Sequence, residues 1–304
     1  MKNENSLKKK GIATIIVIAF LVMAVIVVTE GVILANYLVR SENIVRAIRE
    51  EEIIKAINTV EFAKRGISQA VLYSFNQAAY DIGSRGGYFN IPSGISLNCV
   101  PYWKIFSASN IPSDFESELK QNVLKILNSY GDSLDIDVPK YEDVQFDKDN
   151  NLMNLTSSGK LAYDGDYYKI SDSANFVQDV DMKVFKMFDV AKEVEEELNS
   201  GISDKQYYSD ALNTILSIES SVGKKYSADG IEIFIQPSDN LGDSENHFAI
   251  RILVAIKDTS HKQLVYDYSG KSLQMNNLQF RYYMLVGNSQ ITPETNSCSE
   301  INYK

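Results

Sequence analysis

The chain has 304 residues and a formal net charge of −10, because 40 Asp and Glu outnumber 30 Lys and Arg. Residues 1–85 carry +3, which leaves −13 on residues 86–304. Such an acidic surface repels phosphate backbones, so we expect no nucleic acid as a partner. About 219 residues can bury a core of their own, as one domain over 86–304 or as two lobes, 86–200 and 201–304.

The N-terminal segment predicts a membrane helix. Three consecutive lysines and Gly11 precede an unbroken apolar run, Ile12 to Val28, and a second apolar run covers residues 32–39. The first run makes about 26 Å of helix, and both runs together exceed the roughly 30 Å hydrocarbon core of a bilayer. Because the lysines lie on one side, residues 1–11 are predicted to be cytoplasmic, 12–39 transmembrane and the remainder extracellular.

Three interpretations of this segment stay open. A cleaved secretory signal has an apolar region of about 7 to 15 residues, whereas this run is longer and continues beyond its weak candidate site at Thr29–Gly31. An uncleaved signal anchor explains the whole segment without processing. In the third interpretation a peptidase removes residues 1–11 and leaves the apolar helix intact.

The third interpretation rests on a resemblance. Lys-Lys-Gly directly before Ile12 and its apolar successors resembles an archaeal class III, or prepilin-type, signal of type IV pilin-like proteins. The resemblance covers about 20 to 30 residues. It implies cleavage between Gly11 and Ile12 at the cytoplasmic face, and packing of the freed helix with its copies in a filament core. The fifth position after the cut is Ile16, not the glutamate usual in bacterial pilins, so the charge pairing that sets register there is missing.

Residues 40–85 are predicted to form a helical stalk that continues the membrane helix. No proline occurs before Pro92, and apolar residues recur at steps of three and four. The glycines at 83, 86 and 87 are expected to end the helix. Opposite charges four residues apart support an exposed helix by a few tenths of a kcal/mol per pair. These pairs are Arg46 with Glu50, Glu51 with Lys55, and Glu61 with Arg65.

The apolar stripe of the stalk has two expected uses. Its C-terminal end, rich in small and aromatic residues such as Phe75 and Ala78, is predicted to pack on the following domain. The half nearer the membrane has no evident local partner, so we interpret it as a face for self-association or for another pilin-like subunit. This association face comprises Ile44, Ile48, Ile53, Ile57 and Val60.

Residues 86–304 are predicted to fold as α+β. A capping box at Ser113–Glu116 opens a helix that Gly131 closes. Residues 134–171 indicate short strands joined by polar turns. Val180, Met182 and Val184 alternate as in a strand, and a charged helix follows over 192–198.

The C-terminal third is predicted to contain one helix and an antiparallel meander. The helix covers residues 204–226, with Ser203 as its cap. Gly270 to Ser272 is interpreted as a hairpin turn. Alternation at period two predicts four strands. They cover residues 231–235, 248–256, 263–268 and 279–286.

Two covalent features are expected of an exported domain. Cys99 and Cys298, the only cysteines, indicate a disulfide, although two free buried thiols stay open as the alternative. The bridge would hold the C-terminal tail near the end of the long helix and stabilise by up to roughly 5 kcal/mol. Asn154 begins an N-glycosylation acceptor, Asn-Leu-Thr, expected on a turn.

Candidates for catalysis and metal binding are few. His247 and His261 are the only histidines, without a second histidine at metal spacing or an adjacent nucleophile motif, so we expect surface or strand-edge roles. The loop from Asp147 resembles the start of a calcium loop but lacks the closing glutamate. No cofactor is expected. Weak calcium candidates are Asp147, Asp149, Asp164 and Asp166.

Two functions follow as hypotheses. The first is a non-enzymatic, single-pass membrane protein of the cell surface, a structural or pilin-like subunit that assembles through its N-terminal helix. The second is a monotopic ectodomain that binds an extracellular ligand or partner, or an exported hydrolase without a recognisable motif. Processing after Gly11 would mark the first hypothesis, and an intact N-terminus the second.

Overall fold

The computed structural model describes residues 4–131, 138–165, 168–267 and 271–298, with side chains described from Met23 onward. The fold is α+β, as predicted. The chain divides into two compact units: Met1–Val60 with Tyr163–Ile170, and Glu61–Ala162 with Ser171–Lys304. The division between the units within the long helix falls between Val60 and Glu61.

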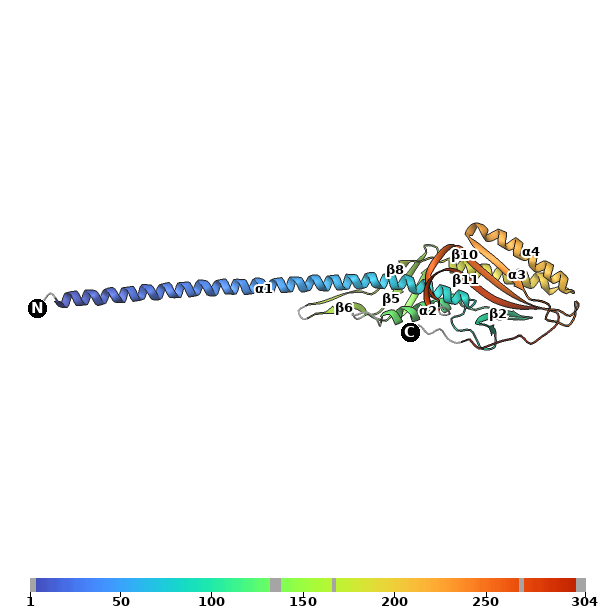
Figure 1. Ribbon diagram of the computed structural model, residues 1–304, viewed down its shortest axis with the longest axis horizontal. Coiled ribbons are helices and arrows are strands. Elements are labelled where there is room, and N and C mark those ends of the chain that lie inside the picture. Colours follow the sequence, from blue (N-terminus) through green and yellow to red (C-terminus); the bar gives the residue numbers. More distant parts are fainter. Residues whose placement is uncertain (1–3, 132–137, 166–167, 268–270, 299–304) are drawn as a thin grey trace. The chain divides into compact units, whose positions relative to one another are not determined.

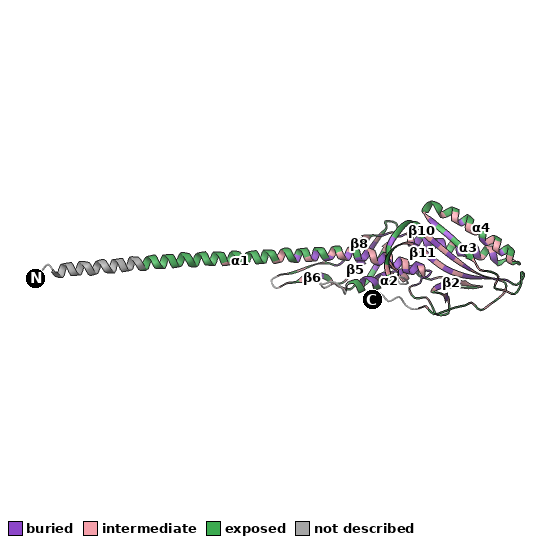
Figure 2. Ribbon diagram, in the orientation of Figure 1, coloured by how far each residue is buried: buried purple, intermediate pink, exposed green. Residues whose placement is uncertain are grey.

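Helix α1 (Glu4–Ser84) is one continuous helix of 81 residues (Figure 1). Its described N-terminal part is exposed, whereas buried positions recur from Ala56 and dominate beyond Ala70 (Figure 2). The helix ends as predicted at glycines: Gly86 and Gly87 have φ of 58° and 90°, and the amide of Gly87 donates to the Ile82 carbonyl at 2.8 Å.

A six-stranded mixed sheet forms the centre of the second unit. Five strands follow the order β1-β2-β11-β10-β9, and β3 pairs with β2. Strands β2 and β11 are parallel, and the other neighbours are antiparallel. The strands are β1 (Ser96–Leu97), β2 (Val100–Ile105), β3 (Ala108–Ser109), β9 (Ile231–Pro237), β10 (Ala249–Asp267) and β11 (Ser272–Gly287).

Four strands are predicted in the C-terminal meander, and the described residues form three, β9, β10 and β11. The segment predicted as a strand over 263–268 continues β10 after a register shift between Lys257 and Lys262. A bulge keeps both parts in one strand because it absorbs extra residues without ending the ladder. Asp267 pairs with Ser272, which confirms a hairpin there, although residues 268–270 lie outside the described residues.

Two smaller sheets complete the strands. One has the order β4-β5-β8, and the other pairs β6 with β7. Short strands between residues 134 and 171 are thus confirmed. Their bounds are β4 (Asp143–Asp147), β5 (Leu152–Thr156), β6 (Lys160–Asp164), β7 (Lys169–Ser173) and β8 (Phe176–Asp179).

Helix α2 (Phe115–Gly131) confirms the predicted element, but its cap differs from the predicted box. Asp114 Oδ1 accepts from the amide of Ser117 at 2.9 Å, so Asp114 rather than Ser113 caps the first turn. Its apolar residues Phe115, Leu119 and Val123 are buried at steps of four, as on one face of a helix.

The predicted strand at Val180–Val184 is wrong. Helix α3 (Lys183–Ser203) begins there and includes the predicted charged segment 192–198. Val184, Met187 and Ala191 are buried at helical steps of three and four, which three alternating residues could not distinguish from a strand.

Ser203 is not the cap of the next helix, because it ends α3. Helix α4 (Tyr208–Tyr226), followed by the 3-10 turn η1 (Ser227–Asp229), is held at its start by a distant residue. The backbone amide of Tyr208 donates to the Glu245 carbonyl at 3.0 Å, and that of Ser209 to Glu245 Oε1 at 2.8 Å. Two of the amides at the helix start are thus satisfied from another part of the chain.

The core of the second unit joins α1 residues to the sheet and to α2 and α3. Trp103 stacks on Tyr282 with ring centroids 4.2 Å apart, and contacts Phe188 and Phe280 edge to face. Its indole Nε1 donates to the carbonyl of Gly86 at 2.8 Å. This core takes residues from both predicted lobes, before and after residue 200.

Two glycines of α1 give a matched test of this packing. A Cβ at Gly83 would lie 2.3 Å from the carbonyl oxygen of Gln279, whereas a Cβ at Gly66 would meet nothing within 4 Å. Helix propensity alone favours alanine at both sites by up to about 1 kcal/mol. We expect Gly66→Ala to stabilise by about 0.5–1 kcal/mol, and Gly83→Ala to destabilise by about 1–3 kcal/mol. Urea unfolding of the full chain in detergent measures both, and equal stabilisation by the two would contradict the packing of α1 on β11.

Candidate functional site

The first candidate site is the apolar part of α1. By length and composition the described helix from Met23 can cross a membrane, and none of its most apolar window is buried within the protein. The hydroxyl group of Thr29, which follows the first apolar run, is satisfied within the helix, because Thr29 Oγ1 donates to the Val25 carbonyl at 2.8 Å. Gly11 and Ile12 lie in the same helix, and cleavage between them remains a prediction.

The predicted association face is only partly exposed. The side chains of Ile44, Ile48 and Ile57 are 60, 51 and 47 % exposed. Ile53 is half-buried, and Val60, at 3 % exposure, is wrongly assigned to this face. Exposed apolar side chains of the stalk that the predicted face omitted are Val45, Ile54 and Phe62.

The sequence interpretation failed at Val60 because it treated the stalk as free before residue 86. Tyr163–Ile170 belongs to the same compact unit as the helix up to Val60. A Cβ at Gly165 would lie 3.0 Å from Glu52 Oε1, so the β6–β7 segment approaches the helix closely there. This approach to Glu52 comes from a segment more than 100 residues away, so helical periodicity cannot reveal it.

Among the described residues of α1, one predicted charge pair forms and Glu61 pairs differently from the prediction. Arg46 and Glu50 are linked at 3.2 Å and are both well exposed. Glu61, predicted to pair with Arg65, instead lies 3.5 Å from Lys64, which also pairs with Asp172 of β7. Exposed pairs of this kind contribute little individually.

The predicted disulfide is present between Cys99 and Cys298. Asn296 is held beside the bridge: its backbone amide donates to the Ser96 carbonyl at 2.8 Å, and its Oδ1 accepts from the amide of Asn98 at 2.8 Å. The bridge therefore fixes a C-terminal tail that already pairs with the segment following α1.

Two of the four predicted calcium residues, Asp147 and Asp164, have other partners. Both carboxylate oxygens of Asp147 accept from Asn150, and Asp164 pairs with Lys169 at 2.8 Å. Asp149 lies in the exposed turn after β4. Asp166 lies outside the described residues. Asp147 and Asp164 thus have structural roles, in a turn and a hairpin.

Asn154 lies on β5, not on a turn as predicted. β5 is the middle strand of its sheet, and the Asn154 side chain is half-exposed. The hydroxyl-bearing Thr156 ends that strand. The acceptor sequence lies within a strand pattern, because Met153 and Leu155 on either side of Asn154 are both buried, at period two.

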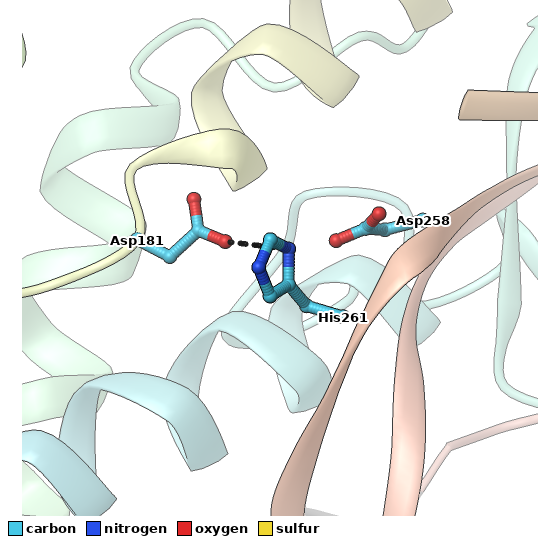
Figure 3. A group of neighbouring side chains, drawn as sticks. All are labelled: Asp181, Asp258 and His261. Atoms are coloured by element: carbon cyan, nitrogen blue, oxygen red, sulfur yellow. Dashed lines mark ion pairs between the residues drawn. The ribbon is translucent and has the colours of Figure 1, made fainter. Parts of the chain in front are cut away.

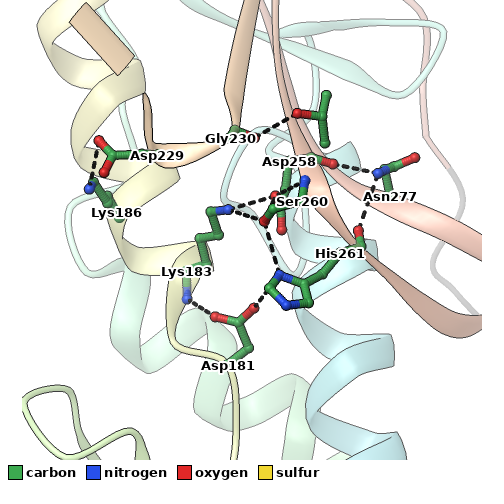
Figure 4. A network of polar contacts seen from close by, with 10 residues as sticks. Asp181, Lys183, Lys186, Asp229, Gly230, Asp258, Ser260, His261 and Asn277 are labelled. Carbon is green, nitrogen blue, oxygen red and sulfur yellow. Dashed lines mark hydrogen bonds and ion pairs between the residues drawn. The ribbon is translucent and has the colours of Figure 1, made fainter. Parts of the chain in front are cut away.

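A polar cluster that the sequence did not reveal joins the start of α3 to the bulge of β10. Asp181, Asp258 and His261 place potential ligand atoms within 4.8 Å of one another (Figure 3). Lys183 Nζ donates to Asp258 Oδ1 at 2.6 Å and to Ser260 Oγ at 2.5 Å (Figure 4). His261 is exposed, as the expected surface role requires, and it lies on β10, an interior strand of the sheet.

The chemistry of this cluster is that of a structural ion pair. Lys183 supplies the positive charge beside Asp258, whose side chain is only 1 % exposed. Burial raises the pKa of Asp258, but hydrogen bonds from Lys183 and Ser260 outweigh burial and hold the pKa below its ordinary value. The Ser260 hydroxyl donates to Asp258 Oδ1 at 2.6 Å, so this proton is directed to a carboxylate that is already paired.

Searches of protein-family models, curated proteins and solved structures find no match to this chain.

We expect Lys183→Met to destabilise the protein by about 3 kcal/mol near neutral pH, because it leaves Asp258 buried without its cation. The low pKa of Asp258 gives the native protein stability above the unfolded pKa, and this stability is lost as pH falls through the folded pKa. The variant lacks that stabilisation, so the difference in free energy of unfolding between it and the unmutated protein should become smaller in acid. Denaturant unfolding at neutral and acidic pH measures the difference.

Lys186→Met is the matched control on the same helix. Lys186 pairs with Asp229 at 2.9 Å, but both side chains are more than 40 % exposed. Loss of an exposed pair changes stability by less than about 1 kcal/mol. If the two variants lost equal free energy of unfolding, the Lys183–Asp258 pair would not be acting as a buried ion pair.

Proposed function

We propose that the chain is a membrane-anchored surface subunit of pilin-like type, which acts by assembly through α1 and not by catalysis. The observation that carries this proposal is the continuity of α1. One helix contains an apolar, wholly exposed segment and also supplies residues to the core of the second unit. In such a chain one continuous helix connects the anchor to the folded domain in sequence, without an intervening loop.

The exposed apolar residues of α1 are buried by two different surroundings in this proposal, lipid for one group and protein for the other. Those up to Val39 match a bilayer in length and composition. Ile44, Ile48 and Ile57 follow that segment, beside charged residues that exclude them from lipid. Burying apolar area is worth about 25 cal/mol per Å². A protein surface is therefore the favoured cover, and the same helix in a neighbouring copy is its nearest source.

The charge pattern supports the same arrangement. Both signs alternate around the stalk, with Arg46 and Arg49 beside Glu50 and Glu51. Neighbouring copies shifted along the helix axis can pair opposite charges at the edges of an apolar contact, as flanking charges do in coiled coils. The three lysines before Ile12 favour a cytoplasmic N-terminus, and the acidic remainder then lies outside the cell.

The first test concerns processing. We expect protein from native membranes to begin at Ile12, because the segment before it carries the prepilin-type pattern. Intact-mass spectrometry and N-terminal sequencing measure this directly. Gly11→Val should abolish the cut and leave residues 1–11 attached. A native N-terminus at Met1 in the unmutated protein would contradict the pilin-like assignment and leave a simple signal anchor.

The second test concerns assembly. We expect Ile44→Asp combined with Ile48→Asp to reduce cross-linked oligomers in native membranes at least about tenfold, because buried carboxylates are unfavourable at a helix contact. Asn43→Asp combined with Asn58→Asp adds the same charge without removing apolar area and should retain the oligomers. If the unmutated protein yields only monomer, the assembly proposal fails.

A further inference from the structure

The second unit contains a cavity of about 460 Å³ that the assembly proposal does not use. It lies between the C-terminal end of α3, the turn from β2 to β3 and the residues that follow β11. Its volume falls in the range of about 300–1,000 Å³ that is usual for small-ligand sites. Polar side chains from all three segments line it: Lys104, Ser107, Asn199, Asn288 and Gln290.

The charges at this cavity nearly cancel. Lys104 Nζ lies 4.0 Å from Glu195 Oε1, and the two side chains are 12 and 8 % exposed. This separation is too long for a hydrogen bond, so the ammonium group retains protons for an acceptor. The C-terminal end of α3 adds partial negative charge. Glu195 behind Lys104 and this helix end both oppose the positive charge of the ammonium group, so the cavity favours a neutral ligand rich in acceptors.

Three lining side chains are available for a ligand. Among the residues that the structure describes, Ser107, Asn199 and Gln290 make no side-chain hydrogen bond. Asn288 instead has a structural role. Its side-chain Nδ2 donates to the Asn246 carbonyl and its Oδ1 accepts from the Phe248 backbone amide, each at 2.9 Å. Hydroxyl and amide groups both donate and accept, which matches a ligand that does the same.

Phe106 supplies an aromatic wall under backbone strain. Its φ is 51°, a conformation that costs a bulky residue roughly 1–2 kcal/mol. The conformation is held because the Phe106 amide donates to the Leu285 carbonyl at 2.7 Å. Glycine would occupy this two-residue turn without strain, yet the chain has a phenyl ring there that lines the cavity. The negative face of an aromatic ring attracts polarised C–H groups.

We propose that this cavity binds one residue of a neutral saccharide. Its hydroxyls accept from Lys104 and exchange hydrogen bonds with Asn199 and Gln290, and its C–H face lies on Phe106. A purely apolar ligand would leave the ammonium and both amides unpaired. The head of a surface subunit would then contact glycans, an activity that does not depend on assembly through α1.

Saturation-transfer NMR tests the proposal with four probes: glucose, galactose, mannose and N-acetylglucosamine. The full chain is kept in a detergent without sugar headgroups, because maltosides and glucosides would compete. We expect saturation transfer to at least one probe, and at least about tenfold weaker binding of glucuronate than of glucose. No transfer to any of the four at tens of millimolar, or equal binding of glucuronate, would overturn the assignment.

Variants locate the binding. Asn199→Ala with Gln290→Ala should raise the Kd at least about tenfold, and Asn213→Ala, an exposed change on α4, should leave it unchanged. Phe106→Gly separates binding from folding, because glycine relieves the strained φ while removing the ring. This variant should fold with an unaltered circular dichroism spectrum and bind at least about tenfold more weakly. Binding that survives both the double variant and Phe106→Gly would place the sugar elsewhere.

Discussion

The fold depends on how the last part of α1 is held in the second unit. Gln77 is 1 % exposed, and its side chain forms hydrogen bonds with both the backbone amide and the backbone carbonyl of Tyr266 in β10. The Tyr266 amide donates to Gln77 Oε1 at 2.6 Å, and Gln77 Nε2 donates to the Tyr266 carbonyl at 3.2 Å and to Asp81 at 2.9 Å. A buried amide is tolerated only when its groups are paired, so these bonds fix the position of the helix along β10.

This arrangement brings distant parts of the chain to the end of α1. The carbonyl of Gly86, just beyond the helix, accepts from Trp103, whose ring stacks on Tyr282 of β11. The Cys99–Cys298 disulfide then ties the C-terminal tail to the following segment. Closing a loop of 199 residues restricts the unfolded chain and stabilises by up to about 5 kcal/mol on the loop-entropy account. The exported setting inferred from the N-terminus is also the one in which such a bond persists.

Periodicity predicted those features whose cause is local. The long helix, its glycine end and α2 follow from patterns within a few turns, and two cysteines allow one pairing within a chain. The features that were missed depend on distant contacts. Glu245 caps α4 from 36 residues away, and Lys183 meets Asp258 across 75 positions without any motif. The burial of Val60 likewise reflects tertiary packing that no helical stripe encodes.

Helix α3 links the two polar sites of the second unit through its dipole. At its start, Asp181 Oδ1 accepts from the Lys183 amide at 3.0 Å, so a carboxylate lies at the positive end. At its end, Lys104 lines the same cavity as Asn199 and Ser203, so a cation lies near the negative end. The paired Lys183 makes the first site rigid. Lys104, at 4.0 Å from Glu195, retains hydrogen-bonding capacity, which is why ligand binding is assigned to the cavity and a structural role to the cluster.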